Sequence, residues 1–203
     1  MINCPKSYFI LSKSLIPEVV GIANGKISLE ICDKAEADKV ISQYHYSKKA
    51  TKNSFLSIRI NDGQGYMQLG YGIRPAIKSA ICEGIKKGNF AEFDRMWLSD
   101  NLPKFSESMA IGLLIKLLRR VRPNLKYLIT YADESAGNKG TIYKASNAFF
   151  IGSIPCDFYI LETGERVHPV SMYHRHGSRS KATLEAIYPN IKHIKGEYRQ
   201  FRF

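Results

Sequence analysis

The sequence has few cysteines, and their spacing gives them no structural role. Four cysteines are scattered over 203 residues without any CxxC pair: Cys4, Cys32, Cys82 and Cys156. This spacing argues against a zinc-binding motif and against a dense disulfide framework. Free thiols of this kind are typical of proteins in a reducing cytosol.

Long apolar runs and nucleotide-binding motifs are also missing. No run approaches the roughly 18 apolar residues that a membrane helix needs. The N-terminal apolar stretch is short and interrupted by charge and proline, so it does not read as a secretion signal. Neither GxxxxGK[ST] nor GxGxxG occurs. We therefore expect a soluble, non-secreted protein with no membrane partner and no common nucleotide-binding loop.

Positive charge is present in excess. Thirty Lys and Arg against eighteen Asp and Glu give a formal net charge of +12, and a basic surface attracts polyanions because neutralised phosphates release counterions. The charge gathers at about 175–203, where aromatic side chains at Tyr198, Phe201 and Phe203 interleave with arginines and could stack on bases. The sequence therefore predicts contact with nucleic acid. A second basic cluster at 116–126 closes a helix, where it also suits the helix dipole.

Hydrophobic periodicity predicts a helix-rich α/β chain. The expected elements, in order, are a helix over 33–44, a hairpin of strands 55–60 and 66–73, a short helix over 76–85, a strand over 90–98, a helix over 109–121, a buried strand over 125–132, a helix over 140–150 and a hairpin over 158–169. This order predicts one mixed sheet, antiparallel first and parallel in the centre, flanked by helices. We expect a single domain over 1–203 with a basic C-terminal segment.

Two places in such a sheet favour a functional site. Strand, helix and strand over 91–132 form a right-handed βαβ unit, and ligands bind beyond the carboxyl ends of parallel strands. Glu107 and Ser108 follow the first strand, at the start of the long helix, where free backbone amides bind anions; Ser108 could equally be a simple helix cap. Asp133 ends the second strand, and it could act chemically or merely begin a turn. Tyr143 could act as an acid or base there, or be a half-buried aromatic.

Two further residues draw attention. His45 precedes a basic loop and could titrate or bind a metal, although a lone histidine usually does neither. Strict alternation along 90–98 would place Glu92, Asp94 and Met96 on one face of the strand, and Phe93, Arg95 and Trp97 on the other. A buried Arg95 would need an anionic partner, which could be a carboxylate or a ligand phosphate.

Four segments together resemble the Mom-type DNA-modification proteins of bacteriophages. They are "YHYSKK", "FDRMWLSD", "SESMAIG" and "YADESAGNKGTIYKASNAFFIG". The resemblance covers roughly residues 36–175, and its most specific part is the spacing of Tyr-Ala-Asp, Gly-Thr-Ile-Tyr, Ala-Ser-Asn and Phe-Gly from 131 to 152.

The resemblance implies an acetyltransferase-like (GNAT) fold and an enzyme that modifies phage DNA. Members of the family put a carbamoylmethyl (acetamido) group on the exocyclic amine of adenine, which masks the DNA from host restriction enzymes. The expected partner is double-stranded DNA with a flipped adenine, since the amine is out of reach inside the duplex. The expected location is the cytoplasm of a bacterial host. Both a monomer and a dimer fit the sequence.

The resemblance also suggests roles for single residues. The catalytic candidates are His45, Tyr46, Asp133 and Tyr143. The donor-binding candidates are Arg95, Glu107, Ser108, Gly140 and Thr141. Iron has been considered for the family, and His45 and Asp133 would be its candidate ligands. The distribution of charge assigns DNA contact to Lys48, Lys49, Arg175, Arg179, Lys181, Arg199 and Arg202.

The donor stays open between acetyl-CoA and another small acyl or glycyl-type donor. A standard acyl transfer would give an amide rather than a carbamoylmethyl group, and the glycine-rich loop of acetyltransferases is missing, with only Gly112 inside the helix. Two alternatives remain. One is a conventional N-acetyltransferase acting on protein, tRNA or a small amine, and the other is a non-catalytic phage DNA-binding protein.

Overall fold

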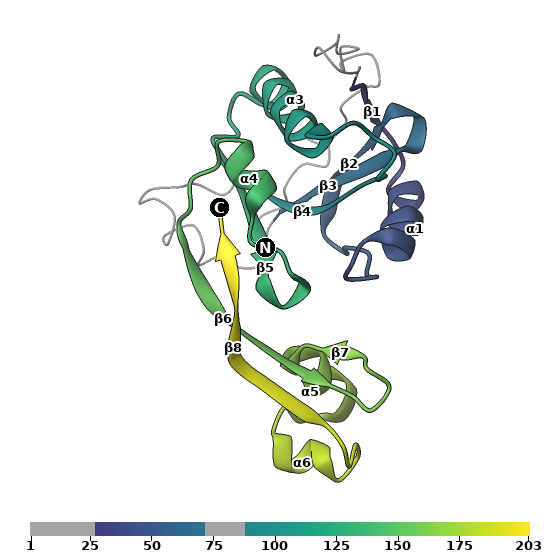
Figure 1. Ribbon diagram of the computed structural model, residues 1–203, viewed down its shortest axis with the longest axis vertical. Helices are drawn as coiled ribbons and strands as arrows, with labels where there is room; N and C mark the ends of the chain where they lie inside the picture. Colours follow the sequence, from purple (N-terminus) through teal and green to yellow (C-terminus); the bar gives the residue numbers. More distant parts are fainter. Residues whose placement is uncertain (1–26, 72–87) are drawn as a thin grey trace. The chain divides into compact units, whose positions relative to one another are not determined.

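The computed structural model describes residues 27–71 and 88–203 as a mixed α/β protein (Figure 1). The described chain falls into two compact units. Unit 1 runs to Tyr131 and also contains Gly140–Phe150 and Phe203, whereas unit 2 contains Ala132–Lys139 and Ile151–Arg202. The helix expected over 76–85 lies outside the described residues, as do Cys4 and Cys82. A single domain over 1–203 stays a prediction.

Unit 1 is built on the predicted sheet, extended at one edge by the strand Leu29–Ile31, which was not predicted. Strands β1 (Leu29–Ile31), β2 (Ser54–Ile60), β3 (Gly65–Gly70) and β4 (Phe90–Leu98) pair antiparallel in chain order. Strand β5 (Tyr127–Asp133) then pairs parallel to β4. The 3-10 turn η3 (Asn61–Gly63) closes the β2–β3 hairpin. The expected change from antiparallel to parallel pairing is confirmed.

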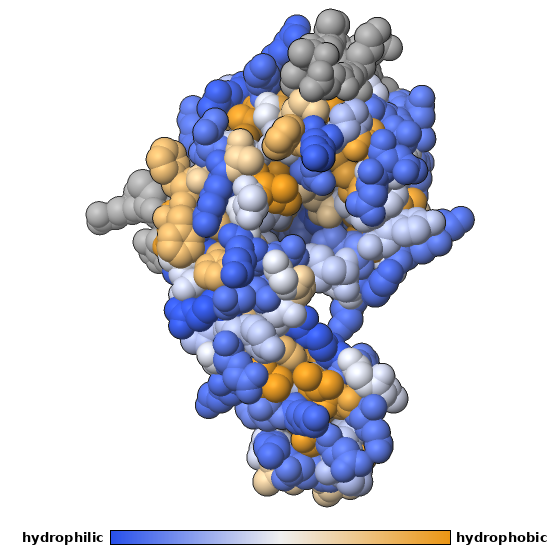
Figure 2. All heavy atoms as spheres, in the orientation of Figure 1, coloured by the Kyte–Doolittle hydropathy of each residue, from blue (hydrophilic) through white to orange (hydrophobic). Residues whose placement is uncertain are grey.

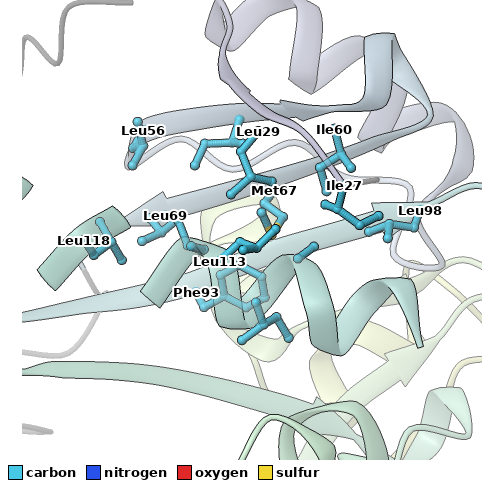
Figure 3. Close-up of a cluster of buried hydrophobic side chains, with 14 of the residues drawn as sticks. Ile27, Leu29, Leu56, Ile60, Met67, Leu69, Phe93, Leu98, Leu113 and Leu118 are labelled. Atoms are coloured by element: carbon cyan, nitrogen blue, oxygen red, sulfur yellow. The ribbon is translucent and has the colours of Figure 1, made fainter. Parts of the chain in front are cut away.

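Helices cover both faces of this sheet. Helix α3 (Ser106–Val121) packs its apolar side on one face, where Ala110 and Leu114 are completely buried. Leu113 and Leu118 of this helix lie in the same cluster as Met67 and Leu69 of β3 (Figure 3). Helix α1 (Lys34–Tyr44) covers the other face with Ala37 and Ile41. Both helices were predicted, because a repeating apolar stripe needs a sheet face to bury it.

The expected alternation along β4 is wrong from Asp94 onward. Gln68 pairs with Arg95 and Leu69 pairs with Phe93, so Asp94 is an extra, bulged residue. An extra residue reverses the side on which each later residue points. Phe93 and Met96 therefore both join the α3 core, while Trp97 packs with α1.

The helix predicted over 140–150 is shorter than expected. Helix α4 spans Thr141–Ala145 only. Asn147 takes a left-handed conformation with φ 61°, and such a residue ends a helix. The amide of Ala148 then bonds back to the carbonyl of Tyr143 at 2.9 Å, so the chain leaves the helix in an ordered turn.

Unit 2 contains a predicted hairpin and several elements that the sequence did not reveal. Strand β6 (Gly152–Ile160) and strand β7 (Arg166–Val167) form the predicted hairpin. The 3-10 turn η4 (Glu134–Ala136), helix α5 (Pro169–His176), helix α6 (Lys181–Glu185) and strand β8 (Lys192–Arg202) were not predicted. A small core of Tyr159, Leu161, Val167, Met172, Leu184 and Ile191 holds the unit together.

The chain's last residue belongs to unit 1. Phe203 pairs with Thr130 through two backbone hydrogen bonds of 3.0 Å, and its side chain is only 5% exposed. The expectation that Phe203 is an accessible stacking side chain is therefore wrong, whereas Tyr198 remains 38% exposed. Within the described ranges, none of the helices combines the length and apolarity that crossing a bilayer requires.

Candidate functional site

The parallel strands β4 and β5 part at a definite point. Their pairing ends with Phe93 opposite Thr130, although β4 continues to Leu98 and β5 to Asp133. The hydroxyl of Thr130 donates to the carbonyl of Phe93 at 3.3 Å across the last paired rung. Backbone groups beyond this fork have no partner in the neighbouring parallel strand, which makes the fork a natural place for a ligand.

Tyr143 projects from α4 to this fork. Burial raises the pKa of its phenol, while a hydrogen bond with Thr130 and the charge of Arg95 act in the opposite direction. Its ring meets the edge of Phe93 at 6.3 Å between centroids and lies 5.6 Å from the ring of Phe203. The phenol is therefore held in its protonated form at neutral pH, as a proton donor at the base of the fork.

Gly140 has a structural reason to be glycine. It precedes α4 with φ +72°, and a β-carbon there would lie 2.2 Å from two ring carbons of Phe203. The contact lets Phe203 pack against Tyr143. Thr141, the first residue of α4, is exposed. The predicted donor-binding role of Gly140 and Thr141 stays a prediction, and the packing of Phe203 accounts for the glycine by itself.

His45 is buried and neutral at physiological pH. It follows α1 and is 7% exposed. Burial first, and then the charges of Arg95 and Lys48, lower its pKa to about 4. The amide of Ser47 donates to Nδ1 of His45 at 3.1 Å. Since Nδ1 accepts, the proton of the neutral ring is on Nε2, which makes His45 a hydrogen-bond donor rather than a base.

Arg95 is the cation that the other residues share. It is half-buried on β4, and its charge influences the pKa values of both His45 and Tyr143. Its guanidinium donates to the carbonyls of Asp94 at 2.7 Å and Lys49 at 3.4 Å. Across the described chain, no carboxylate forms a salt bridge with it. An anionic group of a ligand would complete its coordination.

Tyr46 and two lysines surround His45. The ring of Tyr46 lies over that of His45 at 4.2 Å, and its side chain is 50% exposed. Lys48 and Lys49 are exposed, and the ammonium group of Lys48 bonds to the carbonyl of Gln43 near the end of α1. This corner of unit 1 is therefore basic and accessible around a buried imidazole.

At the start of α3, backbone amides rather than side-chain hydroxyls are the groups that could bind an anion. The hydroxyl of Ser108 donates to the carbonyl of Phe105 at 3.0 Å, and no side chain caps the helix. Ser108 is therefore not the helix cap. Glu107 and Ser108 both lie in the first turn, where amides carry the positive end of the helix dipole. Their predicted role in binding the donor stays a prediction.

Asp133 is surrounded by donors in unit 2. One carboxyl oxygen accepts from the amide of Ser135 at 2.9 Å, from the hydroxyl of the same residue, and from the thiol of Cys156 at 3.8 Å. The other oxygen forms an ion pair with Arg166 at 3.3 Å. Asp133 thereby caps η4. Its catalytic role stays a prediction, beside a clear structural one.

A metal centre finds little support in this arrangement. Within residues 27–71 and 88–203, no group of three or more His, Cys, Asp or Glu side chains could hold a metal ion. Nδ1 of His45 is already an acceptor for Ser47. The residues described do not fit an iron site, and no step below uses one.

The basic residues of unit 2 are mostly tied to local partners. Arg175 pairs with Glu165 at 2.9 Å, Lys181 pairs with Glu185 at 3.1 Å, and Arg199 donates to Ser153. All three are exposed, like Arg179, whereas Arg202 is partly buried. Figure 2 shows hydrophilic side chains over much of the visible surface. Exposed pairs of this kind are weak enough to exchange partners for phosphates.

Comparison with known proteins decides the family. Residues 26–203 match the Mom protein family. The chain belongs to this family. It is also 32% identical to the methylcarbamoylase Mom of Escherichia phage Mu, over 96% of this chain and 84% of that protein. The predicted Mom relationship is thereby confirmed.

Sequence reasoning missed three residues in and around the candidate site of this Mom protein. Thr130 was read only as part of a buried strand, Phe203 as an exposed aromatic, and Asp94 as one residue in a regular alternation. A threonine inside an apolar strand was a signal that could have been used, because its hydroxyl needs a partner when buried. The bulge at Asp94 and the return of Phe203 to unit 1 depend on long-range pairing and left no local signal.

Proposed function

We propose that this Mom protein is an enzyme that adds a carbamoylmethyl (acetamido) group to the exocyclic amine of adenine in phage DNA, which protects that DNA from host restriction. The observation that carries the proposal is the family match over residues 26–203, together with 32% identity to a protein named as a methylcarbamoylase. The net charge of +12 supports a polyanionic substrate.

The geometry of unit 1 supports a group-transfer site. An antiparallel sheet that becomes parallel at β4 and β5, with a fork at Phe93 and Thr130, suits an acetyltransferase-like (GNAT) arrangement. A donor would extend into the fork with its anionic part near the first-turn amides of α3, at Glu107 and Ser108. The donor stays open between acetyl-CoA and another small acyl or glycyl-type donor, and it would have to supply the carbamoylmethyl carbon in activated form. The chain's own residues would bind and orient it.

Three side chains have defined states that suit this role. Tyr143 keeps its proton and can donate it or hold an oxygen of the donor. Nε2 of His45 donates a hydrogen bond at neutral pH, because Nδ1 accepts from Ser47. Arg95 lacks a salt-bridging carboxylate in the part of the chain that the structure describes, so it can stabilise negative charge that develops during transfer.

The target adenine must leave the duplex before its amine reaches such a site. Exposed lysines at Lys48 and Lys49 and the basic residues of unit 2 can bind the phosphates around it. Binding of this kind is independent of sequence and depends strongly on salt concentration.

The test is direct. The protein is expressed in a bacterium, the DNA is digested to nucleosides, and adenine derivatives are measured by mass spectrometry against cells with an empty vector. We expect deoxyadenosine carrying an added carbamoylmethyl group. Tyr143→Phe, which keeps the ring contacts with Phe93 and Phe203, should lower its yield by about 10²-fold or more. Unmodified adenine in the presence of soluble, folded protein would reject the proposal.

A further inference from the structure

Asp94 is the one residue of β4 that the sheet does not accommodate in its regular pairing. It is the extra residue of the bulge between Phe93 and Arg95. It directly follows Phe93, the last residue of β4 paired with β5. Bulges of this kind are often placed next to active sites, where they aim a side chain away from the regular pattern. Asp94 therefore follows the last paired rung before the fork and precedes the shared cation Arg95, and its carboxyl group lies against Gly70 of β3.

The carboxyl group of Asp94 has an enclosed side and an open side. A β-carbon on Gly70 would lie 2.2 Å from Oδ2, so this oxygen rests directly on a strand position where only glycine leaves room. Oδ2 is sealed from solvent and has no hydrogen-bond partner in the described chain. The residue as a whole is only partly buried. We therefore assign contact with the substrate to Oδ1, the other oxygen of this partly buried residue.

The charges around Asp94 make an unusual setting for a carboxylate. Glu92 on β4 repels a negative charge there, while Arg95 on β4 and Lys34 on α1 attract it. Burial is the largest influence, and together these effects raise the pKa of Asp94 to about 7. A sealed carboxyl oxygen without a donor lowers stability, and sites that are kept despite such a cost are often functional.

The geometry points to Asp94 as the group that accepts the proton of the adenine amine during transfer. This inference rests on the proposed function. As the bond between N6 and the transferred carbon forms, the N6–H bond breaks and its proton passes to Oδ1 of Asp94. The electron pair of the bond between that carbon and its activated carrier leaves with the carrier. Atoms and electrons balance, and the only co-reactant is the donor.

Asp94 suits this task better than an ordinary surface aspartate. A general base works best when its proton affinity is matched to the operating pH, and a carboxyl group becomes a stronger base when burial outweighs the neighbouring cations, as it does at Asp94. Asp133 is placed differently, because donors already contact both of its oxygens. The amine of adenine is weakly nucleophilic, so a stronger base contributes more to its reaction.

The experiment compares Asp94→Asn with Asp62→Asn, which changes an exposed carboxyl group in the η3 turn of the same unit. Modified adenine is measured by mass spectrometry in cells that express equal amounts of soluble protein. We expect Asp94→Asn to lower the modified fraction at least 100-fold and Asp62→Asn to leave it within about twofold of wild type. Asp94→Ser, which is smaller, should lose the same activity even if the amide of asparagine disturbs the contact with Gly70.

The outcomes separate the two proposals. If wild type modifies adenine and both Asp94 variants do so within about tenfold of it, the role of Asp94 is rejected and the proposed function stands. If wild type itself leaves adenine unmodified, the proposed function fails first. Loss in both variants, with melting temperatures equal to or above that of wild type, supports the assignment, because an unfolded protein would melt lower.

Discussion

Asp94 in the middle of β4 and Asp133 at the end of β5 are both strand aspartates, and their surroundings are opposite. Asp133 accepts hydrogen bonds from Ser135 and pairs with Arg166. Asp94 has no donor for Oδ2 anywhere in residues 27–71 and 88–203. A carboxylate that is fully bonded holds a turn together, whereas one that lacks donors lowers stability and gains basicity. Asp133, which the sequence pattern made the stronger candidate, is therefore the aspartate with more hydrogen-bond donors around it.

The largest effect is expected at Gly70. Gly70→Ala would push a methyl group into Oδ2 of Asp94, and we expect a loss of about 2–3 kcal/mol of folding free energy. Urea unfolding measures it. Gly112→Ala is the control, since no atom lies within 4 Å of its added carbon, and it should stabilise the helix by about 0.5–1 kcal/mol. The double variant Gly70→Ala/Asp94→Ala removes the carboxyl group as well and should recover part of the lost folding free energy. If it recovers none, the added methyl group clashes with an atom other than those of the Asp94 side chain.

Asp133→Ala should have the next largest effect on stability. It removes the acceptor for Ser135 and leaves Arg166 without its carboxylate, so we expect unit 2 to lose about 1–2 kcal/mol. Arg166→Lys keeps the positive charge but loses the planar set of guanidinium donors, so it should lower the folding free energy by less than Asp133→Ala does. A thermal melt of each variant checks the order. Equal stability of Asp133→Ala and wild type would contradict the structural role of this turn.

Asp94→Asn should stabilise the folded protein, whereas the two preceding variants destabilise it. The pKa of Asp94 in the folded chain, about 7, lies above its ordinary value of 3.8. The folded protein therefore binds more protons than the unfolded one between these values, and ionisation of Asp94 removes stability as the pH rises through that window. The variant should melt roughly 2–4 °C above wild type at pH 8, with the difference vanishing near pH 4. A variant that melts lower at pH 8 would show that Asp94 has a stabilising partner.

The smallest effect concerns His45, which also belongs to the accessible corner of unit 1. Its pKa in the folded chain is about 4, below the ordinary 6.5. The unfolded chain then binds more protons between these values, so stability falls as the pH drops from about 6.5 to about 4. His45→Gln should remove about 1–2 °C of that acid sensitivity in melts at pH 5. Protonation of both ring nitrogens of His45 in the folded state at pH 6, seen by NMR of the ring, would argue against the buried acceptor at Nδ1.

Local sequence patterns predicted most of unit 1. The α1 and α3 helices, the β2–β3 hairpin and the β4 and β5 strands each repeat an apolar period long enough to read without the fold. Unit 2 was harder, because its small core draws single residues from many short elements. Strand β8 was missed since its sequence, KHIKGEYRQFR, is rich in charge and interrupted by a glycine with φ +75°.

The candidate site divides in the same way. The side chains that a motif could name, His45, Arg95 and Tyr143, were found from sequence, and burial in the fold sets the proton states of His45 and Tyr143. The sequence by itself determined the α/β class, the positive charge, the helices that cover the sheet and the Mom relationship. Only the tertiary structure decided which carboxyl group lacks donors, because hydrogen bonding depends on neighbours brought together by β3–β4 pairing. Pairing of Phe203 with Thr130 brought that ring against Gly140, and β3–β4 pairing set the bulge at Asp94.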